Sequence, residues 1–370
     1  MKKVLFITNI PSPYRVQFFN ELGKKTELTV LFEKSFSNER DDSWKNYRFD
    51  NFNGIIMKGI DRSTDSAFCP QICKYISRKY DFIIVSNIST PTGILAVNYM
   101  RLMKIGYYVE GDGGYPKSGK GIKEKIKHFI ISGAKGCFST GKTHDEYYLT
   151  YGAKKENIYR YPFSSVKRES FITRNFDDVD TILENKKICK QNLDIKEEKM
   201  ILTIGQFIER KGFDVLLKAV KLLPENVGVY FVGGVPTEEY KELAKGLENV
   251  HFVGFKKPTE LSEYYNSADV FVLPTREDIW GLVVNEALSF ALPVVTTDKC
   301  IAGCELIKDG KNGYIVPVEN VEELAEKTKK ILDITTCDEY KKMATACLEI
   351  ADKYTIEGMV ERHLEIIDAK

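Results

Sequence analysis

The chain has 370 residues, of which 54 are basic and 53 are acidic. This length suggests two domains of ordinary size, and the balanced charge argues against a dedicated nucleic-acid-binding protein. The eight cysteines form no C-x2-C pair and only four histidines are present, so we expect no metal site and interpret the cysteines as reduced thiols of a cytoplasmic protein. No apolar run approaches the ~20 residues that a membrane span needs.

Short β-rich runs alternate with helical patterns in the first half of the chain. This alternation predicts a doubly wound parallel sheet with helices on both faces. The expected strands of this half are residues 4–8, 28–32, 82–86, 107–110 and 136–139. The turn after the first strand lacks a G-x-G-x-x-G pattern, which argues against a dinucleotide-dependent oxidoreductase.

Charged residues follow two of these expected strands. Arg15 begins the helix after the first strand, where it either contacts an acceptor substrate or its phosphates, or is an ordinary solvated arginine. Glu110 and Asp112 stand among glycines at the end of the strand 107–110, and glycines let a ligand approach the backbone closely. We therefore predict that both acids line a binding cleft.

A lysine-rich segment follows at residues 117–131. It carries five lysines against one glutamate, and Ile122, Ile126 and Phe129 recur at helical spacing. An amphipathic basic helix suits the surface of an anionic membrane. In the alternative, the helix buries these three side chains in its own domain and leaves its lysines in water. The sequence is compatible with either interpretation and with both together.

The strand and helix alternation restarts after a polar, charge-dense stretch near residues 167–199. The strands expected in the second half are residues 201–205, 229–232, 250–253, 270–273, 294–296 and 313–316. A last helix is expected at about residues 355–369. The restart predicts a first domain at 1–165, a linker at 166–198, a second domain at 199–352 and a terminal segment at 353–370.

Two acids follow the expected strand 270–273, at the end of a sheet where α/β proteins bind ligands. Asp278 lies in the loop, and Glu286 lies about one turn into the helix that Gly281 and Leu282 open, so both can face one small molecule. Carboxylates accept hydrogen bonds from sugar hydroxyls, and the N–H groups of a helix start favour a diphosphate. The alternative is a helix N-cap at Asp278 and a solvated Glu286.

This segment resembles the E-x7-E signature of family 4 retaining glycosyltransferases with the GT-B fold, and residues 293–297 match the strand that comes next in that family. The first acid is Asp278 where the family has glutamate, and Glu277 is the other candidate for that role. Residues 205–212 resemble the family's diphosphate-binding G-R-x4-K-G loop, with Lys211 at the lysine position.

Gln206 stands where the family's loop has arginine. Either Arg210 supplies the second positive charge, or Lys211, Gln206 and the N–H groups near residues 281–283 hold the phosphates. Residues 250–255 resemble the family's base-binding edge, and the same pattern also describes a plain strand and turn. The family often has a histidine near the reacting sugar, and this chain has none near Glu110 in sequence.

The resemblance implies roles for individual residues. The implied catalytic residues are Asp278, Glu286, Lys211, Asp112 and Glu110. The implied donor-binding residues are Gly205, Gln206, Arg210, Lys211, Phe255, Gly281, Leu282, Val283 and Glu286. Acceptor binding is expected of Arg15. No metal and no cofactor are expected, because Lys211 and the helix start would stabilise the departing diphosphate.

The implied fold is GT-B, with two Rossmann-like doubly wound domains facing a cleft and a terminal helix that returns to the first domain. The implied activity is retaining transfer of a sugar from a nucleotide diphosphate sugar to a glycan or polyprenyl-diphosphate-linked glycan in bacterial surface polysaccharide synthesis. We expect a cytoplasmic enzyme, with the inner face of the cell membrane as a further binding surface and no nucleic-acid partner. The alternatives are a GT-B-like nucleotide-sugar epimerase and a non-catalytic sugar-nucleotide-binding module.

Overall fold

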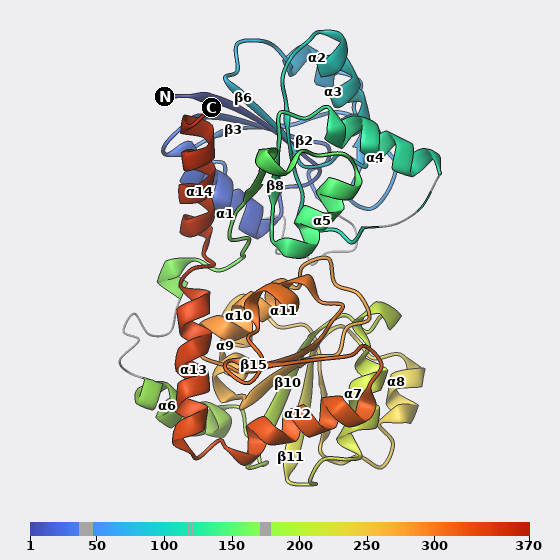
Figure 1. Ribbon diagram of the computed structural model, residues 1–370. Coiled ribbons are helices and arrows are strands. Elements are labelled where there is room, and N and C mark those ends of the chain that lie inside the picture. Colours follow the sequence, from blue (N-terminus) through green and yellow to red (C-terminus); the bar gives the residue numbers. More distant parts are fainter. Residues whose placement is uncertain (37–46, 117–118, 120, 171–178) are drawn as a thin grey trace. The chain divides into compact units, whose positions relative to one another are not determined.

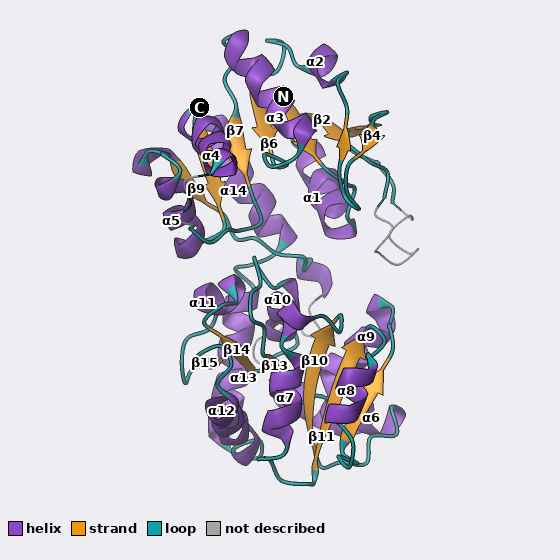
Figure 2. Cartoon of the chain, turned by 90° about the vertical axis from the view of Figure 1, so that its right-hand side faces the viewer, coloured by secondary structure: helices purple, strands orange, loops and turns teal. Residues whose placement is uncertain are grey.

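The computed structural model describes residues 1–36, 47–116, 119, 121–170 and 179–370 (Figure 1). The chain forms two compact units, one of Met1–Ser165 with Thr355–Lys370 and the other of Val166–Tyr354. Each unit is built on a parallel sheet with helices on both faces, as Figure 2 shows. The prediction of two Rossmann-like α/β domains is therefore confirmed.

The sheet of the first unit has seven parallel strands. In spatial order they are β3 (Asn53–Ile56), β2 (Glu27–Phe32), β1 (Lys3–Thr8), β6 (Phe82–Val85), β7 (Tyr108–Glu110), β8 (Gly136–Ser139) and β9 (Ile158–Arg160). An antiparallel pair, β4 (Ile60–Asp61) and β5 (Ala67–Phe68), stands apart from this sheet. The five predicted strands are all present. Prediction missed β3 and β9, which are short and only partly buried and so lack a clear apolar run.

Helices cover both faces of this first sheet. Leu5 and Ile7 of β1 belong to a core that α3 (Pro91–Leu102) and α4 (Ile122–Ser132) help to close. Phe6 points to the other face, where its ring centroid lies 4.9 Å from that of Phe19 on α1 (Pro13–Gly23). The shorter helices of this unit are α2 (Ile72–Tyr75), α5 (Lys142–Thr150) and the 3-10 turn η2 (Lys155–Asn157).

The last helix of the chain, α14 (Ile356–Asp368), is part of the first unit. It packs along α1, and the two helices run side by side in Figure 1. His363 of α14 is fully buried, with its ring 4.8 Å from Phe18 and 4.7 Å from Phe138 between centroids. The terminal segment therefore completes the core of the first unit.

The sheet of the second unit has six parallel strands. In spatial order they are β12 (Val250–Val253), β11 (Val227–Gly233), β10 (Lys199–Gly205), β13 (Val270–Leu273), β14 (Val294–Thr297) and β15 (Gly313–Val316). All six were predicted, because each contains a short apolar run, although the edge strand β12 is only partly buried.

Two groups of helices enclose this second sheet. On one face, a core around Phe213 and Ile331 is closed by α7 (Phe213–Val220), α8 (Glu238–Leu243) and α12 (Val321–Asp333). The helices that pack on one another over the other face are α6 (Val179–Asn192), α9 (Pro258–Ser267), α10 (Leu282–Ser289) and α13 (Asp338–Ala351). The remaining pieces are α11 (Ile301–Leu306) and the 3-10 turns η3 (Arg168–Ser170) and η4 (Glu209–Lys211).

The stretch 166–198 belongs to the second unit, whereas the sequence predicted it as a linker. Its helix α6 buries Val179 and Ile182 against Ala291 and Leu348. Charged residues surround this short apolar stripe in the sequence and conceal it, and one of them, Lys186, is itself buried and donates to the Tyr340 hydroxyl at 2.7 Å.

Candidate active site

Two loops of the second unit meet at the carboxyl ends of the adjacent strands β10 and β13. A Cβ atom at Gly212, in the first loop, would lie only 2.1 Å from the carbonyl oxygen of Pro274 in the second. The φ of 65° at Gly212 also favours glycine. The carbonyl of Arg210 accepts a hydrogen bond from the N–H of Arg276 at 2.8 Å. The two predicted motifs are therefore joined into one surface.

Lys211 and Asp278 form an ion pair on this surface. The Lys211 Nζ lies 2.6 Å from Asp278 Oδ2, and 14% and 12% of the two side chains remain exposed. Arg210 approaches the same carboxylate, with Nη1 at 3.6 Å from Oδ1, and donates to the carbonyl of Glu277 at 2.9 Å. Two cations therefore converge on one carboxylate. A diphosphate at this place would offer the same cations more negative oxygen atoms.

The two candidates for the first acid differ in their surroundings. Glu277 is exposed, and its backbone carbonyl, not its side chain, meets Arg210. Asp278 is 8% exposed and holds Lys211. The alternative of Asp278 as a helix N-cap is wrong, because Gly281 occupies that position of α10.

The start of α10 lies directly beside these charges. Gly281 has a φ of 102°, and a Cβ atom there would approach the sulfur of Cys300 to 2.8 Å. Glycine is therefore required for this tight entry into the helix. The backbone N–H groups of Leu282 and Val283 follow in the first turn, where a helix favours negative charge.

Glu286 stands one turn further along α10 and is partly buried. Its Oε2 accepts a hydrogen bond of 2.9 Å from the hydroxyl of Tyr265, which lies on α9. The alternative of a purely solvated Glu286 is therefore wrong. Sequence analysis missed Tyr265, because no pattern links this residue to an acid on the following helix.

Two more residues of the predicted donor site are exposed at the same edge of the sheet. Gln206 follows β10, and Phe255, with 55% of its surface exposed, follows β12. Gly205 ends β10 beside Gly233 of β11, so close that a Cβ atom on Gly233 would lie 2.2 Å from the Gly205 carbonyl oxygen. The predicted donor-binding residues thus lie on loops at the carboxyl ends of three strands of one sheet, β10, β12 and β13.

Arg276, in the second loop, connects the two loops by hydrogen bonds. Its guanidinium forms two hydrogen bonds of 2.8 Å with Asp214 at the start of α7 and another with Glu319. It also donates to the carbonyl of Glu209 at 2.6 Å. A planar fork bound at three places fixes the Lys211 loop more firmly than a lysine would. Arg276 lies in the loop after the predicted strand 270–273, but nothing in the sequence pattern predicted that it connects the two loops.

The first unit contains a buried charge cluster at the end of β7. Arg15 Nη1 lies 2.5 Å from Glu110 Oε1, and His363 Nε2 lies 3.3 Å from Glu110 Oε2. The hydroxyl of Tyr161 also donates to Glu110, at 3.2 Å. Burial alone would raise the pKa of Glu110, but Arg15 and His363 lower it to about 2. Glu110 is therefore ionised and fully paired.

This burial changes the predicted roles of Arg15 and Glu110. The alternative of a solvated Arg15 is wrong, because only 5% of its side chain is exposed and that of Glu110 is fully covered. Asp112, in contrast, keeps 44% of its side chain exposed, while Arg15 Nη2 at 3.5 Å and the Tyr14 hydroxyl at 3.2 Å hold its carboxylate. Of the two predicted acids, Asp112 is the one that a ligand can reach.

Two histidines lie near this loop although neither is near it in sequence. His363 contacts Glu110, and His144 lies under Gly111, where a Cβ atom would meet its Nε2 at 3.2 Å. Burial lowers the pKa of His144 to about 3, so this imidazole is neutral. The sequence near Glu110 contains no histidine, and the fold brings these two histidines to it from α5 and α14.

The helix α4 lies in the lysine-rich segment and is only partly buried. Ile126 and Ile130 pack on the core, whereas Ile122 and Phe129 are 77% and 41% exposed. The alternative that Ile122 and Phe129 are core residues is therefore wrong. Arg101, at the end of α3, lies 3.8 Å from the centroid of the Phe129 ring.

The lysines of this segment differ in their surroundings. Lys123 and Lys125 are exposed. Lys127 lies 5.2 Å from the ring centroid of Tyr151, which draws it toward the protein. Lys117 and Lys120 lie outside the described residues. No helix in the described parts of the chain is long and apolar enough to cross a membrane.

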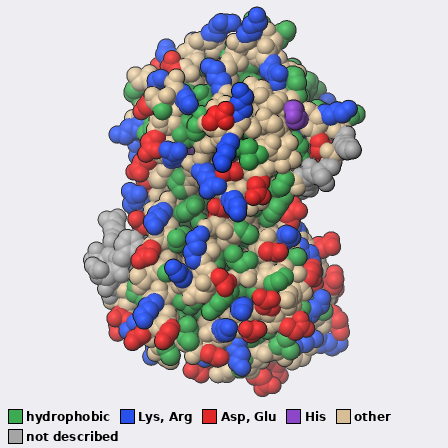
Figure 3. All heavy atoms as spheres, in the orientation of Figure 1, with side chains coloured by type: hydrophobic (Ala, Val, Ile, Leu, Met, Phe, Trp, Pro, Cys, Tyr) green, Lys and Arg blue, Asp and Glu red, His purple; other side chains and the backbone are tan. Residues whose placement is uncertain are grey.

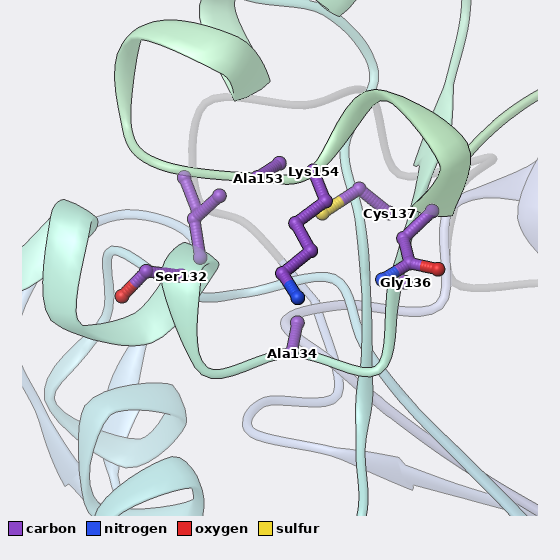
Figure 4. A pocket seen from close by; sticks show the side chains of 8 residues that line it. Ser132, Ala134, Gly136, Cys137, Ala153 and Lys154 are labelled. Carbon is purple, nitrogen blue, oxygen red and sulfur yellow. The ribbon is translucent and has the colours of Figure 1, made fainter.

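A cavity of about 210 Å³ opens elsewhere in the first unit (Figure 4). Gly136 and Cys137 line it from the start of β8, together with Lys154, whose amino group points toward Ala134. It lies at the amino end of the strand, opposite the end that carries the charge cluster. On the second unit, the face in Figure 3 shows acidic and basic side chains interspersed, without one dominant sign.

The chain is similar in sequence to known proteins over the segment that carries this site. Residues 184–347 match the profile of the family described as glycosyl transferases group 1. An uncharacterized glycosyltransferase of Haemophilus influenzae is 30% identical over 203 residues, which are 52% of this chain and 55% of that protein. The chain thus spans about half the length of that relative.

A second relative is aligned over more of the chain. It is the N,N'-diacetylbacillosaminyl-diphospho-undecaprenol alpha-1,3-N-acetylgalactosaminyltransferase of Campylobacter jejuni, 23% identical over 301 residues, 78% of this chain and 77% of that protein. Among solved structures, HepE of Anabaena in complex with UDP covers 100% of both chains with a TM-score of 0.81 at 15% identity. This structural likeness shows the GT-B fold.

Proposed function

We propose, on the premise that residues 184–347 form a domain of the glycosyl transferases group 1 family, that this chain transfers a sugar from a nucleotide diphosphate sugar to a glycan or lipid-linked glycan. The observation that carries the proposal is the Lys211–Asp278 ion pair beside the start of α10. The match to the group 1 family and the two cations, Arg210 and Lys211, at the ends of two strands together support a donor with a diphosphate.

The diphosphate binds to Lys211 in place of Asp278, with the N–H groups of Leu282 and Val283 beside it. When the bond between the anomeric carbon and the phosphate oxygen breaks, negative charge grows on the leaving diphosphate. Lys211 and the helix start stabilise this charge, and such preorganised groups commonly supply the largest part of a rate enhancement. Glu286 accepts hydrogen bonds from the ribose, and Phe255 offers an apolar wall to the base.

Transfer proceeds with retention of the anomeric configuration. The acceptor hydroxyl forms its bond to the anomeric carbon on the face that the diphosphate leaves, and its proton passes to a phosphate oxygen of the donor. This route needs no base, metal or cofactor from the protein. Of the two acids predicted in the first unit, Asp112 is the one that a sugar hydroxyl can reach, and Arg15 supports acceptor binding by holding that carboxylate.

The acceptor in this proposal is a glycan on a polyprenyl diphosphate, as in bacterial surface polysaccharide synthesis. The Campylobacter jejuni relative, which is aligned over 78% of this chain, is named for a diphospho-undecaprenol acceptor. A carrier of this kind is embedded in the membrane, so the enzyme would act at the cytoplasmic surface of the membrane.

Turnover of UDP-, GDP- and ADP-sugars with a polyprenyl-diphosphate-linked glycan tests the proposal. We expect one donor to yield a glycosylated product whose anomeric configuration, determined by NMR, equals that of the donor. An epimerised donor without transfer would identify the epimerase alternative instead. Tight nucleotide binding without any turnover would identify a binding module.

A membrane surface is the second part of the proposal, supported by the exposed side of α4. Ile122 and Phe129 stand beside Lys123 and Lys125 there, and the exposed Leu102 lies at the end of the neighbouring helix α3. Apolar side chains enter the headgroup region while lysines meet anionic lipid, each adding about 1 kcal/mol near the surface.

Sedimentation with vesicles tests this surface. We expect binding to vesicles with anionic phosphatidylglycerol, weaker binding at high salt, and loss on changing Lys123 and Lys125 to glutamine. Changing the exposed Lys154 and Lys155 of the same unit to glutamine is the control for charge alone. Equal binding by both variants would assign the lysines of α4 no special role.

A further inference from the structure

A buried phenol lies against the acid proposed to bind ribose. Tyr265 of α9 is 2% exposed, and its hydroxyl donates to Glu286 Oε2 at 2.9 Å. Its ring stacks on Phe290 at the end of α10, with centroids 4.8 Å apart and planes inclined by 11°. Phe271 of β13 supports the ring with its centroid at 6.0 Å. The position of the hydroxyl is therefore fixed by packing of the ring against two elements, β13 and the end of α10.

The hydroxyl of Tyr265 also has a fixed protonation state. Burial, and then the charge of Glu286, raises the pKa of Tyr265 well above its ordinary value. A protonated phenol beside a carboxylate donates its proton to the hydrogen bond, and the carboxylate can only accept. Since Tyr265 is 2% exposed, it touches Glu286 without reaching a ligand in solvent.

We infer that Tyr265 is a positioning residue, which holds the Glu286 carboxylate in the orientation that receives the ribose hydroxyls of the donor. A glutamate side chain loses much rotamer freedom when it is ordered by a ligand. A carboxylate that is already held by a phenol loses less at the moment of binding, so binding is tighter. This inference rests on the proposed function, because it requires Glu286 to meet the ribose.

The phenylalanine variant isolates the hydroxyl. Tyr265→Phe keeps the ring and its stacking on Phe290, and removes only the hydrogen bond to Glu286. Tyr264→Phe is the matched control, because it makes the same change one residue earlier on α9, at a side chain that is also largely buried (8% exposed). Thermal unfolding without ligand checks that both variants remain folded.

Titration calorimetry on the full chain provides the test. The probes are UDP, GDP and ADP, each compared with its 2′-deoxy and 3′-deoxy forms. We expect wild type to prefer a ribonucleotide over a deoxy form, and Tyr265→Phe to bind that ribonucleotide about fivefold to tenfold more weakly. The affinity of this variant for the deoxy form should change little, so the ratio of its ribonucleotide affinity to its deoxynucleotide affinity should fall. Tyr264→Phe should bind the ribonucleotide and its deoxy form as tightly as wild type does.

Combining the variants separates positioning from a general packing effect. In a Glu286→Gln background, Tyr265→Phe should cause no further loss of ribonucleotide affinity, because the carboxylate that it orients is gone. If wild type prefers the ribonucleotide and Tyr265→Phe prefers it equally, the inference is overturned while the proposed function stands. If wild type shows no preference between ribose and deoxyribose, both the ribose role of Glu286 and the inference are wrong.

Discussion

The Glu110 cluster of the first unit and the Lys211–Asp278 pair of the second are similar in composition and differ in burial. In each, basic groups surround an acid at the carboxyl end of a parallel strand. The side chains of Glu110 and His363 are fully covered, and that of Arg15 is 5% exposed. Lys211 and Asp278 retain 14% and 12% exposure, and Arg210 retains 45%.

The difference follows from where each acid stands in the chain. Glu110 is the last residue of β7, and α14 covers it with His363. Asp278 lies in the loop between β13 and Gly281, where it pairs with Lys211 and keeps 12% of its side chain exposed. Charges of the first kind are shielded from solvent, and removing one of them leaves its partner buried and unpaired. Those of the second kind can exchange the protein's own carboxylate for an anionic ligand.

Removing one charge of the buried cluster should have the largest effect. Arg15→Met leaves Glu110 as a buried anion, so we expect the free energy of unfolding to fall by about 3 to 5 kcal/mol in urea titrations. Lys24→Met, which removes the exposed partner of Glu21, should change it by less than about 1 kcal/mol. A similar small loss for Arg15→Met would mean that the cluster contributes nothing to stability.

Removing the exchangeable cation should affect turnover and leave the fold intact. Lys211→Ala should slow sugar transfer about a hundredfold to a thousandfold, which corresponds to about 3 to 4 kcal/mol of lost transition-state stabilisation. Thermal unfolding should stay close to that of wild type. The control is Lys218→Ala, which removes a half-exposed partner of Asp214. Turnover of Lys211→Ala within a few fold of wild type would refute its role.

Acid should weaken the first cluster through Glu110. Its pKa is about 2 in the folded protein and near its ordinary value, about 4.3, in the unfolded chain. Its contribution is therefore present above about pH 4.3 and is lost as the pH falls toward 2, an effect of about 3 kcal/mol. The free energy of unfolding, measured between pH 5 and pH 2, should fall less steeply in Glu110→Gln than in wild type. Equal slopes in both proteins would contradict the low pKa.

A smaller effect is predicted for the contact with the ribose. Glu286→Gln should weaken binding of the nucleoside diphosphate by about 1.5 to 3 kcal/mol, the range for hydrogen bonds to a charged group. Glu263→Gln, at an exposed position of α9, makes the same change away from the site and should leave the affinity intact. Unchanged affinity in Glu286→Gln would exclude a ribose contact.

Sequence patterns predicted the parts of this molecule that depend on local chemistry. The buried strands appear as apolar runs, and Lys211, Asp278 and Glu286 stand at recognisable spacings, so both sheets and the second-unit loops were found. Contacts between distant segments could not be predicted. His363 reaches Glu110 only because α14 packs on α1, and Tyr265 meets Glu286 only because α9 and α10 are neighbours. The burial of Arg15 follows from the same long-range packing.

The central claim is that Lys211 exchanges Asp278 for the diphosphate of a donor. Calorimetric titration with UDP, GDP and ADP, and with the corresponding nucleosides, measures this exchange in wild type and Lys211→Ala. We predict that one nucleoside diphosphate binds wild type and that Lys211→Ala weakens it at least about tenfold, as expected for a charge-assisted bond. The matching nucleoside should bind both proteins equally. Diphosphate binding that is indifferent to Lys211, or absent for all three nucleotides, would contradict the claim.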